Sequence, residues 1–304
     1  MSNISVVVVT KNRSKDLLEC LGSLLVQTEK IDELIIVDNS STDNTKKIIS
    51  NFSKNTKVNV KYICEKKNGF PIIYNRGLRE AKFNWVAFID DDCVADINWV
   101  KSIKDFINRN VKTDVILGYS STYYTSNIYS LLTFFFQDLW KRKYIFGKKI
   151  SNYEILDNKN IVYNKLFLLN NNLQYDESRV IYNMGAAEDC ELGVSIFKAA
   201  GIAIYNKKMR VAHKDPVNFW FFLEKYYFAM SSYDYFKSEV KFTRQYKERK
   251  IKFRSELLIF IGRLKISYLE KCKMFLLSYL VVFFSFFISY YLKLKAFLKL
   301  NRRY

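Results

Sequence analysis

Short apolar strands alternate with amphipathic helices in the N-terminal part of the chain, and this alternation constrains the fold more than any other feature. Apolar runs rich in β-branched residues, at 4–9, 33–38 and 85–90, are typical of strands covered on both faces. Between the first two runs, residues 14–28 carry leucines at helical spacing. Strands that alternate with helices form βαβ units, and such units build a parallel sheet. The sequence therefore predicts an α/β fold with a mostly parallel sheet flanked by helices.

Polar side chains follow each of these strands at the point where it ends. The clusters lie at residues 10–13, 38–43 and 90–92. In an open parallel sheet the ligand crevice lies outside the carboxyl ends of the strands. Solvated loops explain one such cluster easily and three poorly, so we expect a pocket of nucleotide type at this edge.

Three adjacent acids, Asp90, Asp91 and Asp92, end the third strand. Neighbouring carboxylates repel one another, and one hard dication shared with a diphosphate would relieve the repulsion. Mg²⁺ or Mn²⁺ typically takes one or two carboxylates together with substrate phosphates. The alternative is a turn that caps the next helix without any ligand.

Five stretches in the first two thirds of the chain form a set of motifs: "ISVVVVTKNR", "ELIIVDNSSTDNT", "NGFPIIYNRGLREAKFNWVAFIDDDC", "YDE" and "GAAEDCELGVSIFKAAG". They span residues 4–213, and the tail from about residue 218 lies outside them. In content and order they resemble the motifs of family 2 glycosyltransferases, a resemblance that implies the GT-A fold and inversion of the sugar's anomeric configuration.

The resemblance implies roles in binding the nucleotide sugar and a metal. Asp38 would accept a hydrogen bond from the nucleotide base, Asp90 would face the ribose, and Asp92 would bind Mg²⁺ or Mn²⁺ with Asp90 beside it. One position departs from the family pattern, because Tyr74 stands where an arginine is common, and this departure either changes how the diphosphate is held or has no effect. The full set of residues expected in the nucleotide-sugar pocket is Thr10, Asn12, Arg13, Asp38, Asn75, Asp90 and Asp91.

A second pair of acids, Glu188 and Asp189, begins a predicted helix. Acids in the first turn of a helix favour its dipole, and on spacing alone that is a sufficient explanation. The family resemblance implies instead that this pair supplies the catalytic base, with Asp189 as the first choice and Glu188 as the second. An inverting transfer needs one carboxylate to take the proton from the acceptor hydroxyl.

Two further residues receive roles from the resemblance. His213, the only histidine of the chain, would complete the metal or phosphate site, although a lone histidine is more often structural. Asn160 would lie on the acceptor side. Trp99 is expected in the core rather than as a platform for sugar stacking.

The formal net charge of +19 favours an anionic substrate or an anionic membrane surface as partner. We expect no nucleic-acid partner, because the sequence has no zinc-ligand spacing, RNP motif or basic heptad region. The five cysteines form no C-x-x-C pair and are typical of reduced thiols in a cytosolic protein. The sequence starts directly with a strand rather than with a signal peptide, so the catalytic part is expected to stay in the cytoplasm.

The composition changes near residue 218, so we divide the chain into a GT-A domain at 1–217 and a basic, aromatic helical region at 218–304. A run of 19 residues without formal charge at 274–292 is about as long as a bilayer core is thick. Both of its flanks are basic, so we expect a tail that lies in or re-enters the cytoplasmic leaflet, not one that spans. A core helix is the alternative.

Taken together, the sequence predicts a metal-dependent inverting glycosyltransferase at the cytoplasmic face of the plasma membrane. It would transfer a sugar, from a UDP-sugar in the first instance, to a hydroxyl of a lipid-linked or membrane-held saccharide during polysaccharide biosynthesis for the bacterial cell envelope. Two alternatives stay open, a non-catalytic membrane adaptor of GT-A fold and a sugar nucleotidyltransferase.

Overall fold

The computed structural model describes residues 2–109, 112–178, 187–227 and 250–300, with side chains described as far as residue 284. The chain divides into two compact units. The first comprises residues 1–123 and 145–214, and the second comprises residues 124–144 and 215–304. A helix from the middle of the chain thus belongs to the second unit, whereas the sequence-based division after residue 217 assigns it to the first domain.

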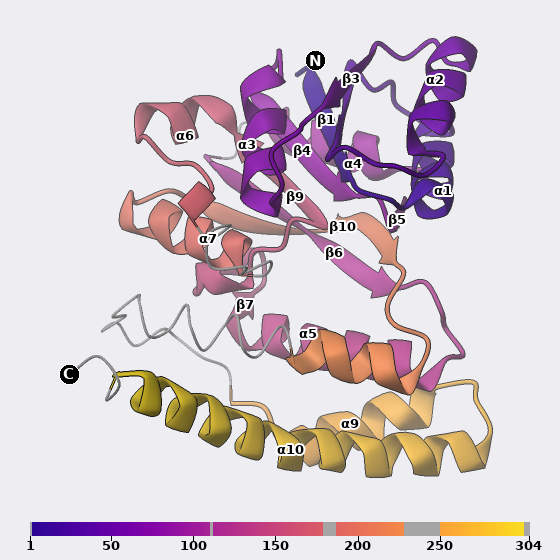
Figure 1. The fold of residues 1–304 in the computed structure, drawn as a ribbon, viewed down its shortest axis with the longest axis vertical. Coiled ribbons are helices and arrows are strands. Elements are labelled where there is room, and N and C mark those ends of the chain that lie inside the picture. Colours follow the sequence, from indigo (N-terminus) through magenta and orange to yellow (C-terminus); the bar gives the residue numbers. More distant parts are fainter. Residues whose placement is uncertain (1, 110–111, 179–186, 228–249, 301–304) are drawn as a thin grey trace. The chain divides into compact units, whose positions relative to one another are not determined.

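The first unit is built on one mixed sheet with the strand order β3-β2-β1-β4-β9-β6-β10-β8-β7, and β5 pairs with β10 (Figure 1). The strands are β1 (Ile4–Thr10), β2 (Glu33–Asp38), β3 (Val60–Cys64), β4 (Trp85–Asp90), β5 (Cys93–Ala95), β6 (Val115–Thr122), β7 (Ile145–Phe146), β8 (Lys149–Ile150), β9 (Asn160–Asn164) and β10 (Ala203–His213).

The sequence-based expectation of a mostly parallel sheet is correct for one half only. Strands β3, β2, β1 and β4 are parallel, as is the pair β6–β10. Strand β9 runs antiparallel between β4 and β6, and β5, β7 and β8 also pair antiparallel. The βαβ pattern ends after β4, so the sequence rule that predicts parallel neighbours no longer applies there.

Helices cover both faces of this sheet. They are α1 (Ser14–Leu25), α2 (Thr45–Asn55), α3 (Phe70–Glu80), α4 (Trp99–Ile107), α6 (Lys165–Asn170) and α7 (Glu188–Lys198), with a short 3₁₀ turn, η1, at Tyr153–Ile155. The apolar faces of α1, α2 and α4 share one core cluster with alternate residues of β1 and β4, including Val6, Val8 and Ala87. The other face of β1 meets α3, where Gly77 lies so close that an added Cβ would be 2.5 Å from a methyl group of Val7. Trp99 is fully buried in the core, as predicted.

The three polar clusters lie at one edge because of the strand register. Thr10 at the end of β1 pairs with Asp38 at the end of β2. Its neighbour Val9 pairs with Asp90 at the end of β4. Since these strands are parallel, their carboxyl ends form one edge, and the loops that follow them lie side by side.

The second unit consists of helices around an apolar and aromatic core. It contains α5 (Ile128–Tyr144), a helical segment at 219–227, α9 (Phe253–Arg263) and α10 (Tyr268–Leu300). Leu132 and Phe135 of α5 pack with Leu257 of α9 and Met274 of α10. Most of the basic run that the sequence shows at 237–254 lies outside the described residues. Within the part of the chain that the structure describes, no helix is both long and apolar enough to cross a membrane.

Candidate active site

The edge of the sheet carries three acids in three different environments. Half-buried Asp90 ends β4 and accepts a hydrogen bond from the Tyr74 hydroxyl over 3.0 Å at Oδ1. Burial, together with the charges of Asp92, Asp157 and Asp91, raises the pKa of Asp90 well above the usual carboxyl value. The phenol of Tyr74 is therefore the neutral donor that holds a carboxylate in a crowded anionic site.

Asp91 points into the protein. Its Oδ2 accepts a hydrogen bond of 2.7 Å from Thr10, and its Oδ1 lies 3.1 Å from the guanidinium of Arg13. Burial raises the pKa of Asp91 to about 6, although Arg13 and Thr10 oppose the shift. Thr10 and Arg13, both predicted for the nucleotide pocket, thus position the acids from the end of β1 and from the loop that follows it.

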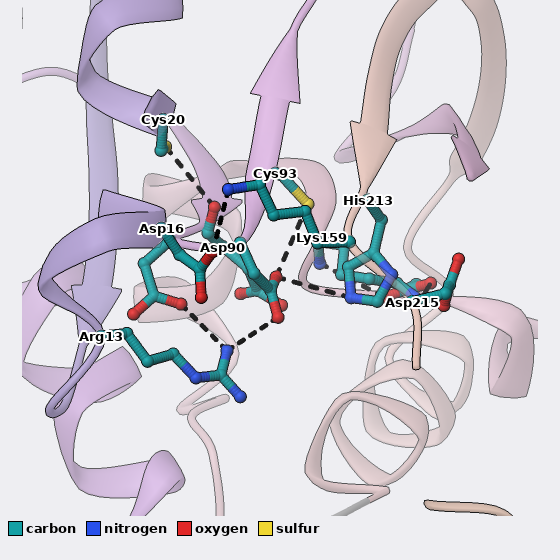
Figure 2. A network of polar contacts seen from close by, with 12 residues as sticks. Arg13, Asp16, Cys20, Asp90, Cys93, Lys159, His213 and Asp215 are labelled. Atoms are coloured by element: carbon teal, nitrogen blue, oxygen red, sulfur yellow. Dashed lines mark hydrogen bonds and ion pairs between the residues drawn. The ribbon is translucent and has the colours of Figure 1, made fainter. Parts of the chain in front are cut away.

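Asp92 lies between a guanidinium and an imidazole. Its Oδ2 is 2.7 Å from Nη1 of Arg13, and its Oδ1 is 3.4 Å from Nε2 of His213. Figure 2 shows Arg13 and His213 reaching the acids from opposite sides. Burial alone would lower the pKa of Arg13, but Asp91 and Asp92 hold it above its usual value. His213 is the last residue of β10 and only 4% exposed, so the sheet fixes its position.

These donors fit a divalent cation that is shared with a substrate. Among the described residues, no three His, Cys, Asp or Glu side chains gather into a complete metal centre, so Asp90, Asp92 and His213 do not form a closed site. Asp92 and His213 still offer an oxygen and a nitrogen close together, and Mg²⁺ commonly takes only one or two protein carboxylates and completes its shell with phosphate and water. Arg13 supplies the positive charge at Asp92 in the present arrangement.

The loops after β1 and β2 are tied to each other. Asn12 accepts the backbone N–H of Thr42 over 2.7 Å, and its own N–H donates to the Ser41 hydroxyl. Both Asn12 and Ser40 adopt a positive φ, at 52° and 54°, which is uncommon for residues with side chains and is frequent at functional sites. The side chain of Asn12 therefore shapes the pocket, whereas its predicted contact with the nucleotide stays a prediction.

Asp38 lies at the far end of the same edge and is 1% exposed. Its Oδ1 accepts from the Ser41 N–H over 2.9 Å and its Oδ2 accepts from the Tyr62 hydroxyl over 3.0 Å. These two donors fix the carboxylate. Each oxygen retains a second lone pair, and the predicted contact of this buried carboxylate with a nucleotide base stays a prediction.

Asn75 serves a different purpose in the fold. Its amide nitrogen donates to the Tyr175 carbonyl and to Glu177 Oε1, both over 2.9 Å, and its oxygen accepts the Tyr175 N–H. The side chain is 2% exposed. It holds the "YDE" segment beside the pocket, and a direct role in nucleotide binding stays a prediction.

Glu188 and Asp189 begin α7, as predicted. The helix follows Ala187, whose φ of 69° is strained for an alanine. Burial, and then the charge of Asp157, raises the pKa of Asp189 to about 6. Glu188 is 8% exposed and Asp189 half-buried, so the pair is partly withdrawn from water. A carboxylate with a raised pKa is suited to accept a proton near neutral pH.

Asp157 and Lys159 belong to this site and are absent from the sequence-based set. Asp157 raises the pKa of both Asp90 and Asp189, and Lys159 lies 3.0 Å from Asp157. The charge of Asp157 therefore acts on the acids at the end of β4 and also on those at the start of α7. The stretch "LDNKN" that carries it has no distinctive pattern, so only the three-dimensional structure reveals its place.

Asn160 is held inside the first unit by hydrogen bonds. It is fully buried, accepts from the Trp99 indole over 2.8 Å, and donates to the carbonyls of Tyr119 and Met209. Gly118 leaves room for it, because a Cβ there would lie 2.2 Å from its amide nitrogen. A buried amide with three partners has a structural role, and the predicted place on the acceptor side stays a prediction.

Comparison with known proteins identifies the family. Residues 5–171 match the model of the family described as glycosyl transferase family 2. Because the match covers more than half of the 304 residues, the chain belongs to this family, which confirms the resemblance found in the sequence.

Curated relatives share only part of their length with this chain. Chondroitin synthase of Escherichia coli is 34% identical over 110 residues, which are 35% of this chain and 16% of that protein. Glycosyltransferase GlyG of Streptococcus pneumoniae is 33% identical over 116 residues, which are 38% of each protein. The chain therefore spans well under two thirds of these relatives.

Solved structures show the same fold at low identity. Residues 1–349 of TarS from S. aureus, in complex with UDP-GlcNAc, align with a TM-score of 0.57 and 17% identity over 90% of this chain and 70% of that one. The mannosyltransferase PcManGT from Pyrobaculum calidifontis, in complex with GDP-Man and Mn²⁺, aligns with a TM-score of 0.59 and 13% identity over 80% and 65%. These likenesses support the GT-A-like α/β fold.

Proposed function

We propose that the protein is an inverting, metal-dependent glycosyltransferase of glycan biosynthesis. It transfers a sugar from a nucleotide sugar, with a UDP-sugar as the first candidate, to a hydroxyl group of a saccharide. The observation that carries this proposal is a grouping of charged residues in a chain of this family. Arg13 and His213 contact Asp92 at the strand-end acids. Asp157 links these acids electrostatically to Asp189, the proposed proton acceptor. The complexes of structural neighbours with UDP-GlcNAc and with GDP-Man support a nucleotide-sugar donor.

The transfer is one in-line displacement. The acceptor oxygen forms a bond to the anomeric carbon while the bond from that carbon to the diphosphate breaks. Asp189 takes the hydroxyl proton, and the diphosphate leaves with the bonding electrons. A positioned base of this kind contributes roughly 10²–10⁴-fold to the rate.

Residues on the opposite side of the reaction hold the donor. Asp92 and His213 would hold Mg²⁺ or Mn²⁺, which when bound neutralises the negative charge that develops on the diphosphate. Arg13 bridges Asp91 and Asp92 and offsets their mutual repulsion, and Tyr74 orients Asp90 toward the ribose side of the donor.

Thermal unfolding with a panel of nucleotide sugars, nucleoside diphosphates and triphosphates tests this function. With Mn²⁺ present, one nucleotide sugar at 100 times its Kd should stabilise the protein by about 2.7 kcal/mol, and EDTA or Asp92→Ala should abolish the shift. Shifts with triphosphates, together with release of pyrophosphate in the presence of a sugar phosphate, would favour a nucleotidyltransferase. No shift with any nucleotide would favour an adaptor without catalysis.

We further propose that the acceptor is lipid-linked or otherwise held at the membrane, with the protein peripheral at the cytoplasmic face of the plasma membrane. The second unit supports this, because it exposes large apolar side chains such as Trp220, at 75%, and Tyr268, at 83%, in a chain with a net charge of +19. Interfacial segments combine such aromatic residues with lysines that attract anionic lipids.

Sedimentation of the full chain with phosphatidylglycerol vesicles tests the membrane contact. Trp220→Ser with Tyr268→Ser should weaken binding, whereas Leu166→Ser with Leu169→Ser, which removes two exposed apolar groups from α6 of the first unit, should not. Equal binding by both double variants would contradict the proposed contact.

A further inference from the structure

A basic cavity of about 730 Å³ lies in the first unit, lined by residues other than those of the candidate active site. It is bordered by α4, by the turn between β7 and β8, and by the part of β10 around residues 205–210. Strand β10 continues from Arg210 to His213, and at about 3.3 Å per residue these two backbone positions lie roughly 10 Å apart. The cavity is thus a separate feature of the sheet.

Positive charge predominates in the lining of this cavity. Six of its fourteen lining residues are Lys or Arg and two are Asp. All six basic residues are exposed, and within the described parts of the chain none of them is in an ion pair. A concave surface lined by one sign of charge focuses the field and attracts the opposite charge more strongly than a convex one. The six are Lys101, Arg109, Lys148, Lys207, Lys208 and Arg210.

An irregularity in β10 presents two of these lysines. The register against β6 shifts between Asn206, opposite Gly118, and Arg210, opposite Tyr119, so the intervening residues bulge from the ladder. Lys207 and Lys208 are exposed there, whereas Met209 stays fully buried. Bulges of this kind re-aim side chains and are frequent next to binding sites.

The bulge is held rigidly. Asn206 is 8% exposed, donates to the Ser102 carbonyl of α4 over 3.0 Å, and accepts the Lys208 N–H over 3.2 Å. The cavity wall is therefore fixed before any ligand arrives, which lowers the entropic cost of binding.

Aromatic rings support two other cations without cancelling their charge. The guanidinium of Arg210 lies 5.0 Å from the centre of the Tyr119 ring, and the ammonium of Lys148 lies 6.0 Å from the centre of the Phe106 ring. A cation over a ring face keeps its N–H donors available for an anion.

We propose that this cavity is a second binding site, for a soluble oligoanion that carries two or more phosphate groups. Its volume exceeds the space that one phosphate fills, and its charges lie on three separate walls, so a single small anion would leave most of them unmatched. A flat membrane surface would bind to a flat or convex patch of the protein, whereas the lysines and arginines here line a concave surface. The inference goes beyond the proposed transfer reaction, because binding requires neither the donor nor a metal.

Calorimetric titration of sodium tripolyphosphate into the protein, in EDTA and at low salt, tests the site. Saturable binding is expected, and Lys207→Glu with Lys208→Glu should weaken it roughly tenfold or more, since the double variant replaces two of the six positive charges of the lining with negative ones. Lys148→Glu, in the turn between β7 and β8, should act in the same direction. The matched control, Lys54→Glu with Lys57→Glu, makes the same charge change at exposed positions that do not line the cavity and should stay within about twofold of wild type.

Three results would overturn the proposal. If the cavity variant and the matched control weakened tripolyphosphate binding equally, the loss of affinity would come from the change in net charge and not from this cavity. Loss of binding in Arg13→Gln but not in the cavity variants would place the anion in the active site. Binding of phosphatidylglycerol vesicles through Lys207 and Lys208, without binding of tripolyphosphate, would assign this surface to a membrane.

Discussion

The hydroxyl of Tyr74 donates a hydrogen bond to Oδ1 of Asp90 over 3.0 Å, from the position where the family pattern often has arginine. Burial keeps the pKa of Tyr74 well above its usual value, so the phenol stays protonated and is a dependable donor. Its ring stacks on Tyr175, with 5.1 Å between ring centres, which fixes its direction. A neutral donor orients Asp90 without cancelling its charge, so more of that charge is left for the donor substrate and its metal.

Tyr74→Phe should therefore lower kcat/KM by roughly tenfold, because it removes one hydrogen bond to a charged group and leaves the ring packing in place. Steady-state kinetics with the nucleotide sugar identified by the thermal-shift panel would measure this loss. Tyr62→Phe is the matched control, since it also removes a phenol hydroxyl, the one that donates a hydrogen bond to Asp38. Equal effects of the two variants on KM and kcat would argue against a specific role for Tyr74.

Local patterns in the sequence predict the parallel half of the sheet and its polar edge. Continuous apolar runs define β1, β2 and β4, and the polar residues that end them come together through register alone. The rest depends on long-range contacts. Nothing local distinguishes β9 as the strand that inserts antiparallel between β4 and β6, and that insertion is what buries Asn160.

The same limit separates the site residues that the sequence predicts from those it misses. Asp90, Asp92 and Asp189 stand in motifs, so the sequence points to them. Asp157 affects the pKa of acids on two other elements although it is distant from both in the chain. Asn75 stands in a motif too, yet its partner is a backbone segment 100 residues later.

Replacement of Arg13 should make stability depend more strongly on pH. The folded-state pKa of Asp91, about 6, exceeds the usual value of about 3.9, so its ionisation opposes folding, an effect absent below pH 4 and complete above pH 6. Arg13→Gln removes the cation beside Asp91 and Asp92, so it should lower Tm more at pH 8 than at pH 5. Arg13→Lys keeps the positive charge, so its pH-dependent loss of Tm should lie between that of Arg13→Gln and that of the wild type. Thermal unfolding at both pH values decides, and a loss independent of pH would contradict the electrostatic explanation.

Asp189→Asn should reduce kcat by roughly 10²–10⁴-fold and leave nucleotide-sugar binding intact, because the variant lacks only the proton acceptor. In the wild type, kcat/KM should rise with pH through a midpoint near the pKa of Asp189, about 6. Since that raised pKa opposes folding once the group is ionised, Asp189→Asn should also raise Tm more at pH 8 than at pH 4.

Glu191→Gln is the control for that experiment, because it changes a charge in the same first turn of α7. Its activity should stay within a few fold of wild type. If Asp189→Asn retained full activity while Glu188→Gln lost it, the base would be Glu188.

Asn160→Ala should destabilise the fold rather than weaken acceptor binding. The variant leaves the Trp99 indole N–H and the carbonyls of Tyr119 and Met209 without their partner in a fully buried place, and each lost bond costs about 1–3 kcal/mol. We expect a loss of about 3 kcal/mol or more in the free energy of unfolding, measured by urea denaturation, with an unchanged KM for the acceptor in the folded fraction. Asn171→Ala, at an exposed position of the same region, should change stability by less than about 0.5 kcal/mol. A raised acceptor KM without loss of stability would instead restore Asn160 to the acceptor side, because only a residue that touches the acceptor could separate the two effects.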